Sequence, residues 1–487
     1  MTDQNAITIL GLGPGRAELL TRQAWQVLEG AREIYLRTRE HPIANDLPQG
    51  VEVHSFDEFY EKYDDFEEVY EHIVAEVLEL GRRPEGVIYA VPGNPFVAEA
   101  AVPEIVRRAR AKGIPVRLIS GLSFIDAVFE ALEVDVLPSA HIVDAFELVS
   151  AHHTPFPPDA PALIAQVYST MMAAQIKITL MAVYPDEHQV KLVHNAGADN
   201  QTVESLPLHE IDKSDAIGPF TSLYVPTLGE NTSFEAFQEL IAHLRAPEGC
   251  PWDREQTHQS LRPNLLEEAY ETLSAIDADD PVAMQEEFGD LLLQVVLQTQ
   301  IASEYGEFKM SDVIHGIHTK LVDRHPHVFG EERIEDAEGV KQNWERIKAG
   351  ERHAKGESKN GLLEGIPDSL PALAQADAYQ KRAARVGFDW PDITGVLDKI
   401  EEEIAEIRRA GDNLSEAEEI GDLLFALANL ARWKNIDPES ALRATNNKFR
   451  RRFAYIETQA EKQGRELSDM TLEEMDAIWD EAKDNGS

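Results

Sequence analysis

The hydrophobic pattern of the chain changes near residue 226, and this change restricts the fold to a multidomain arrangement. Before the change, short apolar runs at residues 6–12, 86–91 and 115–119 are typical of strands, and helical patterns separate them. Strands that alternate with helices predict an α/β sheet domain. After the change, strand-like runs become rare and long amphipathic patterns dominate, which predicts an all-α helical bundle.

Two segments without clear periodicity divide the chain further. Residues 226–231 form a linker, after which Thr232 and Glu235 make the signature of a helix start, in which each side chain caps a backbone amide. Residues 349–371 are rich in glycine, lysine and serine and predict a connection between two helical units. The predicted domains are residues 1–226, residues 232–348 and residues 372–483.

Composition argues against several kinds of partner and location. The formal net charge is -43, so the surface repels phosphate backbones, and nucleic-acid polymers are not expected partners. No run reaches the roughly 18 consecutive apolar residues that span a bilayer, so we expect no contact with a membrane. Cys250 is the single cysteine, and the first residues lack the pattern of an export signal. A cytoplasmic protein is therefore expected.

An acidic pattern occurs twice in the helical half. Each copy is a Glu-Glu-x-x-Glu segment followed by a Glu-Glu-x-x-Asp segment, which runs directly into an apolar helix. Positions three apart share one face of a helix, so two such helices side by side would bring four carboxylates to one point. The quartets are Glu268, Glu271, Glu287 and Asp290 in the first copy, and Glu403, Glu406, Glu419 and Asp422 in the second.

The pairing of the two segments distinguishes these copies from chance. The first segment alone also occurs at residues 67–71 and 331–335, which we interpret as solvated helix faces because no second segment follows. Carboxylates that converge beside an apolar core need cations to neutralise them. Hard oxygen ligands in this number favour Mg²⁺, or else Mn²⁺, over Zn²⁺.

Each copy also contains residues suited to a phosphorylated ligand. A Lys-x-x-x-Arg pair on a later helix offers the cations that phosphate recognition requires. These pairs are Lys320 with Arg324 and Lys448 with Arg452. Trp252 and Trp390 could stack on a nucleobase, although a lone tryptophan more often packs in a core.

With these motifs, residues 234–483 resemble the MazG-type nucleoside triphosphate pyrophosphohydrolases, with two tandem repeats. The resemblance is carried by residues 249–253, 265–271, 287–290, 324–329, 386–390 and 446–453. It implies an all-α fold that hydrolyses nucleoside triphosphates to the monophosphate and pyrophosphate, with magnesium held by both quartets. It also implies that Glu267 and Glu402 orient or deprotonate the attacking water. The implied substrate contacts are Trp252, Trp390 and Asn447.

The MazG resemblance also bears on assembly. Members of this family usually form dimers, because one repeat cannot bury its apolar helix faces alone. A homodimer is therefore implied for this chain, and pairing of the two repeats within one chain remains an alternative.

Three glycine-containing loops of the N-terminal half follow strand-like runs, at residues 11–15, 91–95 and 120–124. Together they resemble the tetrapyrrole methylase family over about residues 6–226, which implies two α/β lobes with S-adenosylmethionine bound between them. The implied cofactor contacts are Leu12, Gly93, Asn94, Pro95, Ser123 and Phe124. Two positions depart from the family pattern, because Asn94 replaces an aspartate and Ser120 replaces a proline.

The fusion of the two parts is similar to the architecture of YabN-type bacterial proteins. The leading hypothesis is a nucleoside triphosphate pyrophosphohydrolase that removes unwanted nucleotides, fused to a methyltransferase. One alternative is a methyltransferase whose helical half only dimerises or senses nucleotides. The other is a regulator that binds nucleotides without turnover.

Overall fold

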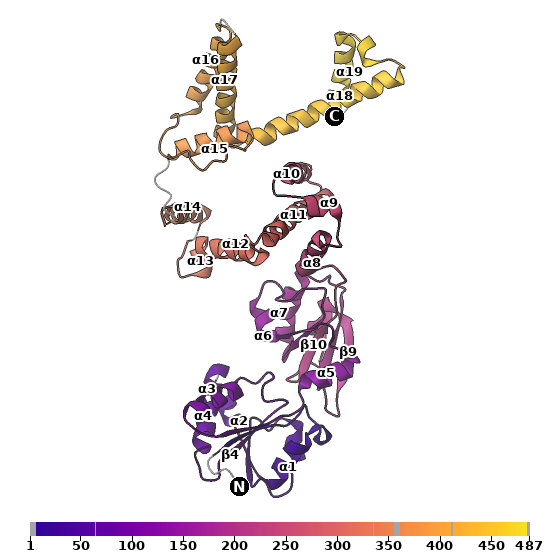
Figure 1. Cartoon of the computed structure of the whole chain (residues 1–487), viewed down its shortest axis with the longest axis vertical. Coiled ribbons are helices and arrows are strands. Elements are labelled where there is room, and N and C mark those ends of the chain that lie inside the picture. The colour runs from indigo at the N-terminus through magenta and orange to yellow at the C-terminus, as the bar shows by residue number, and fades with distance from the viewer. Residues whose placement is uncertain (1–5, 64, 335, 355–360, 411–412, 485–487) are drawn as a thin grey trace. The chain divides into compact units, whose positions relative to one another are not determined.

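The computed structural model describes residues 6–63, 65–334, 336–354, 361–410 and 413–484. The chain divides into two compact units, Met1–Leu244 and Arg245–Ser487, which are drawn from indigo to yellow in Figure 1. The first unit combines sheets and helices, whereas the second contains helices, so the predicted α/β and all-α parts are both confirmed. No helix in the described residues is long and apolar enough to cross a bilayer.

The first lobe of the N-terminal unit is a parallel five-stranded sheet in the order β3-β2-β4-β1-β5. Its strands are β1 (Ile7–Gly11), β2 (Glu33–Leu36), β3 (Glu52–Ser55), β4 (Val87–Val91) and β5 (Val116–Ile119). Its helices are α1 (Arg22–Gly30), α2 (Asp57–Lys62), α3 (Phe66–Leu80) and α4 (Ala101–Ala111). Apolar side chains of α3 and α4 pack on one face of the sheet and those of α1 on the other, which buries β1 and β4 on both sides.

The second lobe is a mixed five-stranded sheet in the order β6-β7-β10-β8-β9, in which only the β6–β7 pair is parallel. Its strands are β6 (His141–Asp144), β7 (Ala162–Ala165), β8 (Gln189–His194), β9 (Thr202–Pro207) and β10 (Thr221–Val225). The helices α6 (Ala145–Ser150) and α7 (Thr170–Met181) cover one face, and α5 (Phe124–Leu132) covers the other. Two packed lobes explain why the N-terminal half behaves as one compact unit.

The helical part contains two successive sets of helices. The first set is α9 (Pro251–Glu255), α10 (Arg262–Asp277), α11 (Pro281–Glu304), α12 (Met310–Arg324), α13 (Pro326–Phe329) and α14 (Ala337–Ala354). The second set is α15 (Ala372–Ala384), α16 (Ile393–Ile407), α17 (Asn413–Trp433), α18 (Pro438–Lys462) and α19 (Leu472–Asp484). In each set two long helices pack as a hairpin, α10 with α11 and α16 with α17. These hairpins carry the duplicated acidic segments.

Aspartate caps define the start of several of these helices. The carboxylate of Asp280 accepts hydrogen bonds from the amides of Val282 and Ala283, and Pro281 follows it at the first helical position. Asp437 and Pro438 repeat this arrangement at the start of α18. Proline suits the first turn because its missing amide has no partner there in any case.

The start of α8 (Phe234–Arg245) differs from the prediction by one residue. Ser233 caps this helix, because its hydroxyl accepts a hydrogen bond from the Ala236 amide. The hydroxyl of Thr232 instead donates to the Gly229 carbonyl, so the predicted pairing of Thr232 with Glu235 is wrong. Adjacent serine and threonine can both cap a helix, and the turn geometry decides between them.

Candidate active site

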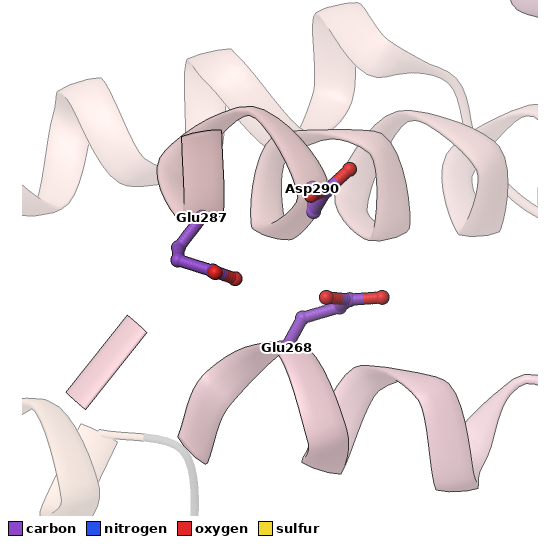
Figure 2. Close-up of side chains that lie close together, drawn as sticks. All are labelled: Glu268, Glu287 and Asp290. Carbon is purple, nitrogen blue, oxygen red and sulfur yellow. The ribbon is translucent and has the colours of Figure 1, made fainter. Parts of the chain in front are cut away.

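The first carboxylate cluster lies on the α10–α11 hairpin. Glu268 projects from α10, and Glu287 and Asp290 project from α11 one turn apart. Figure 2 shows Glu268 and Glu287 reaching toward each other across the gap between the two helices. One carboxylate oxygen from each of the three residues lies within 4.8 Å of those of the other two. This spacing is suited to shared coordination of a cation.

A threonine that the sequence analysis did not single out ties the two helices together at this level. Thr272 is buried, and its hydroxyl lies 2.7 Å from the Glu268 carbonyl oxygen and 3.4 Å from the Glu287 carbonyl oxygen. The single hydroxyl hydrogen can thus be shared between the backbones of α10 and α11. This contact fixes the relative height of the two acidic segments.

The electrostatics of the first cluster are those of crowded anions. Burial, followed by repulsion from Asp290, Glu271 and other neighbouring carboxylates, raises the pKa of Glu268. The pKa of Glu287 is also raised, first by burial and then by Glu271. Glu271 therefore lies within electrostatic range of the cluster, although it is not one of the three residues within 4.8 Å. A bound cation would relieve this repulsion.

The second cluster lies on the α16–α17 hairpin, and it takes two members from its first helix and one from its second, the reverse of the first cluster. Glu403 and Glu406 from α16 meet Glu419 from α17, again with oxygens within 4.8 Å of one another. Burial, then Glu406 and Glu403, and finally Asp422, raise the pKa of Glu419. Asp422 is thus a close neighbour of the cluster rather than one of its three members.

Glu403 is the most buried carboxylate of the two clusters. Its relative exposure is 2%, whereas Glu268 in the first cluster is only half-buried. The Oε2 atom of Glu403 is buried and has no hydrogen-bond partner among the described residues. A buried carboxylate oxygen without a donor is costly unless a cation occupies the site.

A lysine that the sequence analysis also missed contacts this second cluster. The ammonium group of Lys399 lies 2.7 Å from Glu403 and 3.0 Å from Glu402, one turn along α16. Glu402, predicted to orient water, is therefore ion-paired, while Glu267 at the matching position of the first repeat is exposed. The spacing of four residues between Lys399 and Glu403 is the sequence signal that would have revealed this contact.

The four predicted phosphate-binding cations lie on the helices that follow the hairpins. Arg324, at the end of α12, is paired with Glu351 at 2.6 Å and lies over the Trp344 ring. Arg452, on α18, lies over the Trp479 ring in the same way. Lys320 and Lys448 lie one turn earlier on these helices. Neither lysine has an ion pair within the part of the chain that the structure describes.

The predicted base-binding tryptophans are at the surface. Trp252 on α9 has a relative exposure of 58%, and Trp390, before α16, has one of 45%. The indole of Trp390 lies against the backbone of Gly395, where an added methyl group would come within 2.6 Å of the ring. Neither tryptophan is a core residue, so the packing interpretation of these side chains is wrong. Asn447 is half-buried on α18.

The loops of the N-terminal unit meet at the carboxyl ends of β1, β4 and β5. A methyl group added to Gly121 would lie 2.3 Å from the Gly93 carbonyl oxygen and 2.7 Å from the Gly11 carbonyl carbon, so the three backbones are in contact. Gly13 and Gly93 form an isolated bridge, with hydrogen bonds in both directions. Such close approach requires glycine at these positions.

Side chains of the same loops reinforce this contact. The Asn94 amide donates to the Gly121 carbonyl at 3.0 Å, and its oxygen accepts from the Phe96 amide. Ser123 caps α5 through the Ile125 amide. The remaining predicted cofactor contacts are Leu12 and Pro95, which are buried, and Phe124, which is half-buried. The structure therefore places five of the six predicted positions on the loops that follow β1, β4 and β5, and Phe124 at the first residue of α5.

Comparison with known families assigns both parts of the chain. Residues 6–212 match the family model of the tetrapyrrole (corrin/porphyrin) methylases. Residues 256–329 match that of the MazG nucleotide pyrophosphohydrolase domain, and they contain helices α10 to α13 of the first helical set.

Relatives extend this assignment to the whole chain. A Bacillus subtilis strain 168 protein described as "Uncharacterized protein YabN" is 43% identical, and the match covers 98% of each chain. The nucleoside triphosphate pyrophosphohydrolase/pyrophosphatase MazG of Thermotoga maritima is 47% identical over 51% of this chain and 95% of its own length. The nucleoside triphosphate pyrophosphohydrolase of Escherichia coli K12 is 44% identical over 50% of this chain and 94% of its own length.

Proposed function

The chain belongs to the family in which a tetrapyrrole methylase domain is fused to MazG nucleotide pyrophosphohydrolase repeats, and from this we propose its activity. We propose that the helical part hydrolyses nucleoside triphosphates to nucleoside monophosphate and pyrophosphate, with Mg²⁺ as its cofactor and Mn²⁺ as a substitute. Such an activity removes unwanted nucleotides from the cellular pool. The proposed domains are residues 1–226, 232–348 and 372–483.

The observation that carries this proposal is the convergence of three carboxylates on each hairpin within 4.8 Å. The donor set consists of oxygen alone, as Mg²⁺ prefers. The orphaned Oε2 atom of Glu403 marks a position where a cation fits. Glu271 and Asp422 complete the proposed metal quartets, since each lies close enough to raise the pKa of a cluster carboxylate.

The residues of the chain suggest how hydrolysis would proceed. Bound Mg²⁺ would supply positive charge to the triphosphate and lower the pKa of a coordinated water. Glu267 and Glu402 each precede a proposed metal-ligand glutamate, and we propose that they orient the water that attacks the α-phosphorus, or accept its proton. Pyrophosphate then leaves, because the bond between the α-phosphorus and the bridging oxygen breaks.

Cations and aromatic rings would hold the remainder of the substrate. Lys320 and Lys448 are exposed and available to neutralise charge on the leaving pyrophosphate, with Arg324 and Arg452 one turn away on the same helix faces. The exposed faces of Trp252 and Trp390 are proposed to stack on the nucleobase, and Asn447 to contact the nucleotide.

The experiment that tests this proposal measures products from a panel of triphosphates with Mg²⁺. We expect the double variant Glu268→Gln with Glu403→Gln to lose pyrophosphate release by on the order of 100-fold. Glu286→Gln and Glu401→Gln, exposed neighbours outside the clusters, are the matched controls and are expected to retain activity. Orthophosphate as the main product would contradict the proposed reaction class.

We also propose that the N-terminal unit binds S-adenosylmethionine at the loops after β1, β4 and β5. Ligands of open α/β sheets bind at the carboxyl ends of the strands, where these glycine backbones meet. Calorimetry with S-adenosylmethionine tests this proposal, and no heat of binding would contradict it. A methyl acceptor is not part of the proposal.

A homodimer is the proposed assembly. Large apolar side chains on the acidic hairpins remain exposed, including Leu266, Phe288, Leu424 and Phe425. Exposed apolar surface of this kind needs a cover, which a second copy would supply. Light scattering is expected to give twice the chain mass, and Phe288→Asp with Phe425→Asp is expected to give the single-chain mass. We place the protein in the cytoplasm, where its one cysteine stays reduced.

A further inference from the structure

The two carboxylate clusters differ in one charged residue. In the second cluster, Lys399 precedes Glu403 by one helical turn and its ammonium group lies 2.7 Å from the Glu403 carboxylate. The matching position before Glu268 in the first cluster is Asn264. Among the described residues, no lysine, arginine or histidine forms an ion pair with Glu268, Glu287 or Asp290.

This difference changes the charge that each cluster presents to a divalent ion. The first quartet carries four carboxylates and has no paired cation among the residues that the structure describes. The second carries four carboxylates and one ammonium group, so its formal charge is 4 - 1 = 3 negative charges when all groups are ionised. Close charges near a protein surface interact strongly. One fewer negative charge in the second cluster therefore lowers its affinity for a divalent ion.

The contact at Glu403 is also incomplete in a specific way. Lys399 contacts the Oε1 atom, while Oε2 is buried and has no hydrogen-bond partner in the described part of the chain. Lys399 is itself only partly buried, with 40% of its side chain exposed. Its ammonium group can therefore swing into solvent when another cation takes up the Glu403 carboxylate.

We propose that Lys399 is a resident counter-cation of the second site, which competes with the divalent ion for Glu403, so that the first site fills at lower metal concentration. This inference rests on the proposed function, because it assumes that both clusters bind the catalytic metal. Its consequence is graded activation. The first repeat works at low free Mg²⁺, and the second repeat joins it only as the concentration rises.

The test measures metal binding directly, by the loss of the free Mn²⁺ signal in electron paramagnetic resonance of the full chain. Glu287→Gln with Asp290→Asn leaves only the second site, and Glu406→Gln with Glu419→Gln leaves only the first. We expect the second site to bind Mn²⁺ about tenfold more weakly than the first. Lys399→Met, added to the variant that retains the second site, is expected to remove this difference.

A reciprocal variant guards against a folding artefact. Asn264→Lys, in the variant that retains the first site, places an ammonium group beside Glu268 and is expected to weaken Mn²⁺ binding about tenfold. Lys434→Met removes a lysine that lies outside both clusters and is expected to change neither affinity.

The outcomes separate this inference from the function on which it rests. Suppose that Mn²⁺ binds at both sites and that Lys399→Met leaves the affinity of the second site unchanged or lowers it. This result overturns the role of Lys399 and leaves the proposed function intact. No Mn²⁺ binding at either site overturns both. Equal Mn²⁺ affinities of the two single-site variants, with Lys399 present, contradict the proposed order of filling.

Discussion

At the scale of single residues, His41 is a buried histidine that supports the Gly13 turn. Its Nε2 atom donates to the Gly13 carbonyl oxygen at 3.0 Å, and its Nδ1 atom is buried and has no partner among the described residues. Burial lowers the pKa of His41 to about 4, with the Gly13 contact opposing this shift. A second proton on Nδ1 would be buried without an acceptor, so the neutral ring is favoured.

This arrangement predicts a stability that depends on pH. Because the folded pKa lies below the unfolded value of 6.5, the stabilisation is complete above pH 6.5 and is lost as the pH falls through about 4. The full loss is about 3 kcal/mol. Urea unfolding between pH 7 and pH 4 is expected to show this loss in the parent protein and a flatter profile for His41→Gln. His152→Gln, an exposed control, should leave the slope unchanged, and an equal slope for all three would refute the prediction.

The acidic clusters predict the opposite dependence on pH when metal is removed. Burial and neighbouring carboxylates raise the pKa of Glu268, Glu287 and Glu419 above the usual 4.5. The folded state therefore holds more protons than the unfolded state just above pH 4.5, and stability without metal declines as pH rises through that window. Mg²⁺ would bind the ionised form, so we expect its stabilising effect to grow over the same range.

Thermal melts in a chelator at pH 7.5 test this expectation. Glu287→Gln is expected to raise the melting temperature of the metal-free protein by a few degrees and to abolish most of the increase produced by Mg²⁺. Glu286→Gln is the neighbouring control. A lower melting temperature for Glu287→Gln in the chelator would show that repulsion does not govern the metal-free cluster.

At the scale of secondary-structure elements, each exposed tryptophan segment is anchored by a part-buried ion pair to the end of the long acidic helix. In the first repeat, Arg245 pairs with Glu304 at the end of α11 and donates to the Asp253 carbonyl. In the second, Asp389 pairs with Arg432 at the end of α17 and also accepts from the Trp433 indole. The cation of the pair is Arg245, the last residue of α8, in the first repeat and Arg432 on α17 in the second.

Loss of either ion pair is expected to change both the stability of its repeat and the fluorescence of the nearby tryptophan. Glu304→Gln or Asp389→Asn is expected to cost about 1–3 kcal/mol of stability and to broaden the emission of the released Trp252 or Trp390. Asp480→Asn removes an exposed ion pair with Lys483 and is expected to cost far less. Unchanged emission and stability in both anchor variants would show that the pairs do not hold the segments.

The sequence predicted those elements whose pattern is set locally. The apolar runs at residues 6–12 and 115–119 became β1 and β5 because buried parallel strands need continuous apolar sequence. The short strands β2 and β6 were missed, since their mixed sequences are completed by partners distant in the chain. Thr272 and Lys399 were missed for a related reason, because their significance depends on which helix face meets the cluster.

At the scale of the whole molecule, the two proposed sites belong to different compact units, and this predicts separable losses of function. Gly121→Ala places a methyl group against the Gly93 backbone and is expected to weaken S-adenosylmethionine binding at least about tenfold, through forced separation of the loops. Pyrophosphate release should be unaffected. Glu268→Gln with Glu403→Gln should show the reverse pattern.

The control for this comparison is Gly30→Ala, because no atom lies within 4 Å of the methyl group that it would add. Binding of S-adenosylmethionine and release of pyrophosphate are both expected to be retained in Gly30→Ala. Loss of pyrophosphate release in Gly121→Ala would mean that the two halves are coupled, and the clusters would then have to be studied together with the cofactor loops.

Stacking of Arg324 on Trp344 and of Arg452 on Trp479 has an optical consequence. A guanidinium group close to an indole perturbs its fluorescence, and we expect that perturbation to disappear if the arginine moves to an incoming phosphate. With the phosphate-binding role proposed for these arginines, each repeat would contain an intrinsic reporter of substrate arrival. A rapid-mixing trace recorded after removal of the other tryptophans would resolve the order in which the two repeats engage a nucleotide, without any attached dye.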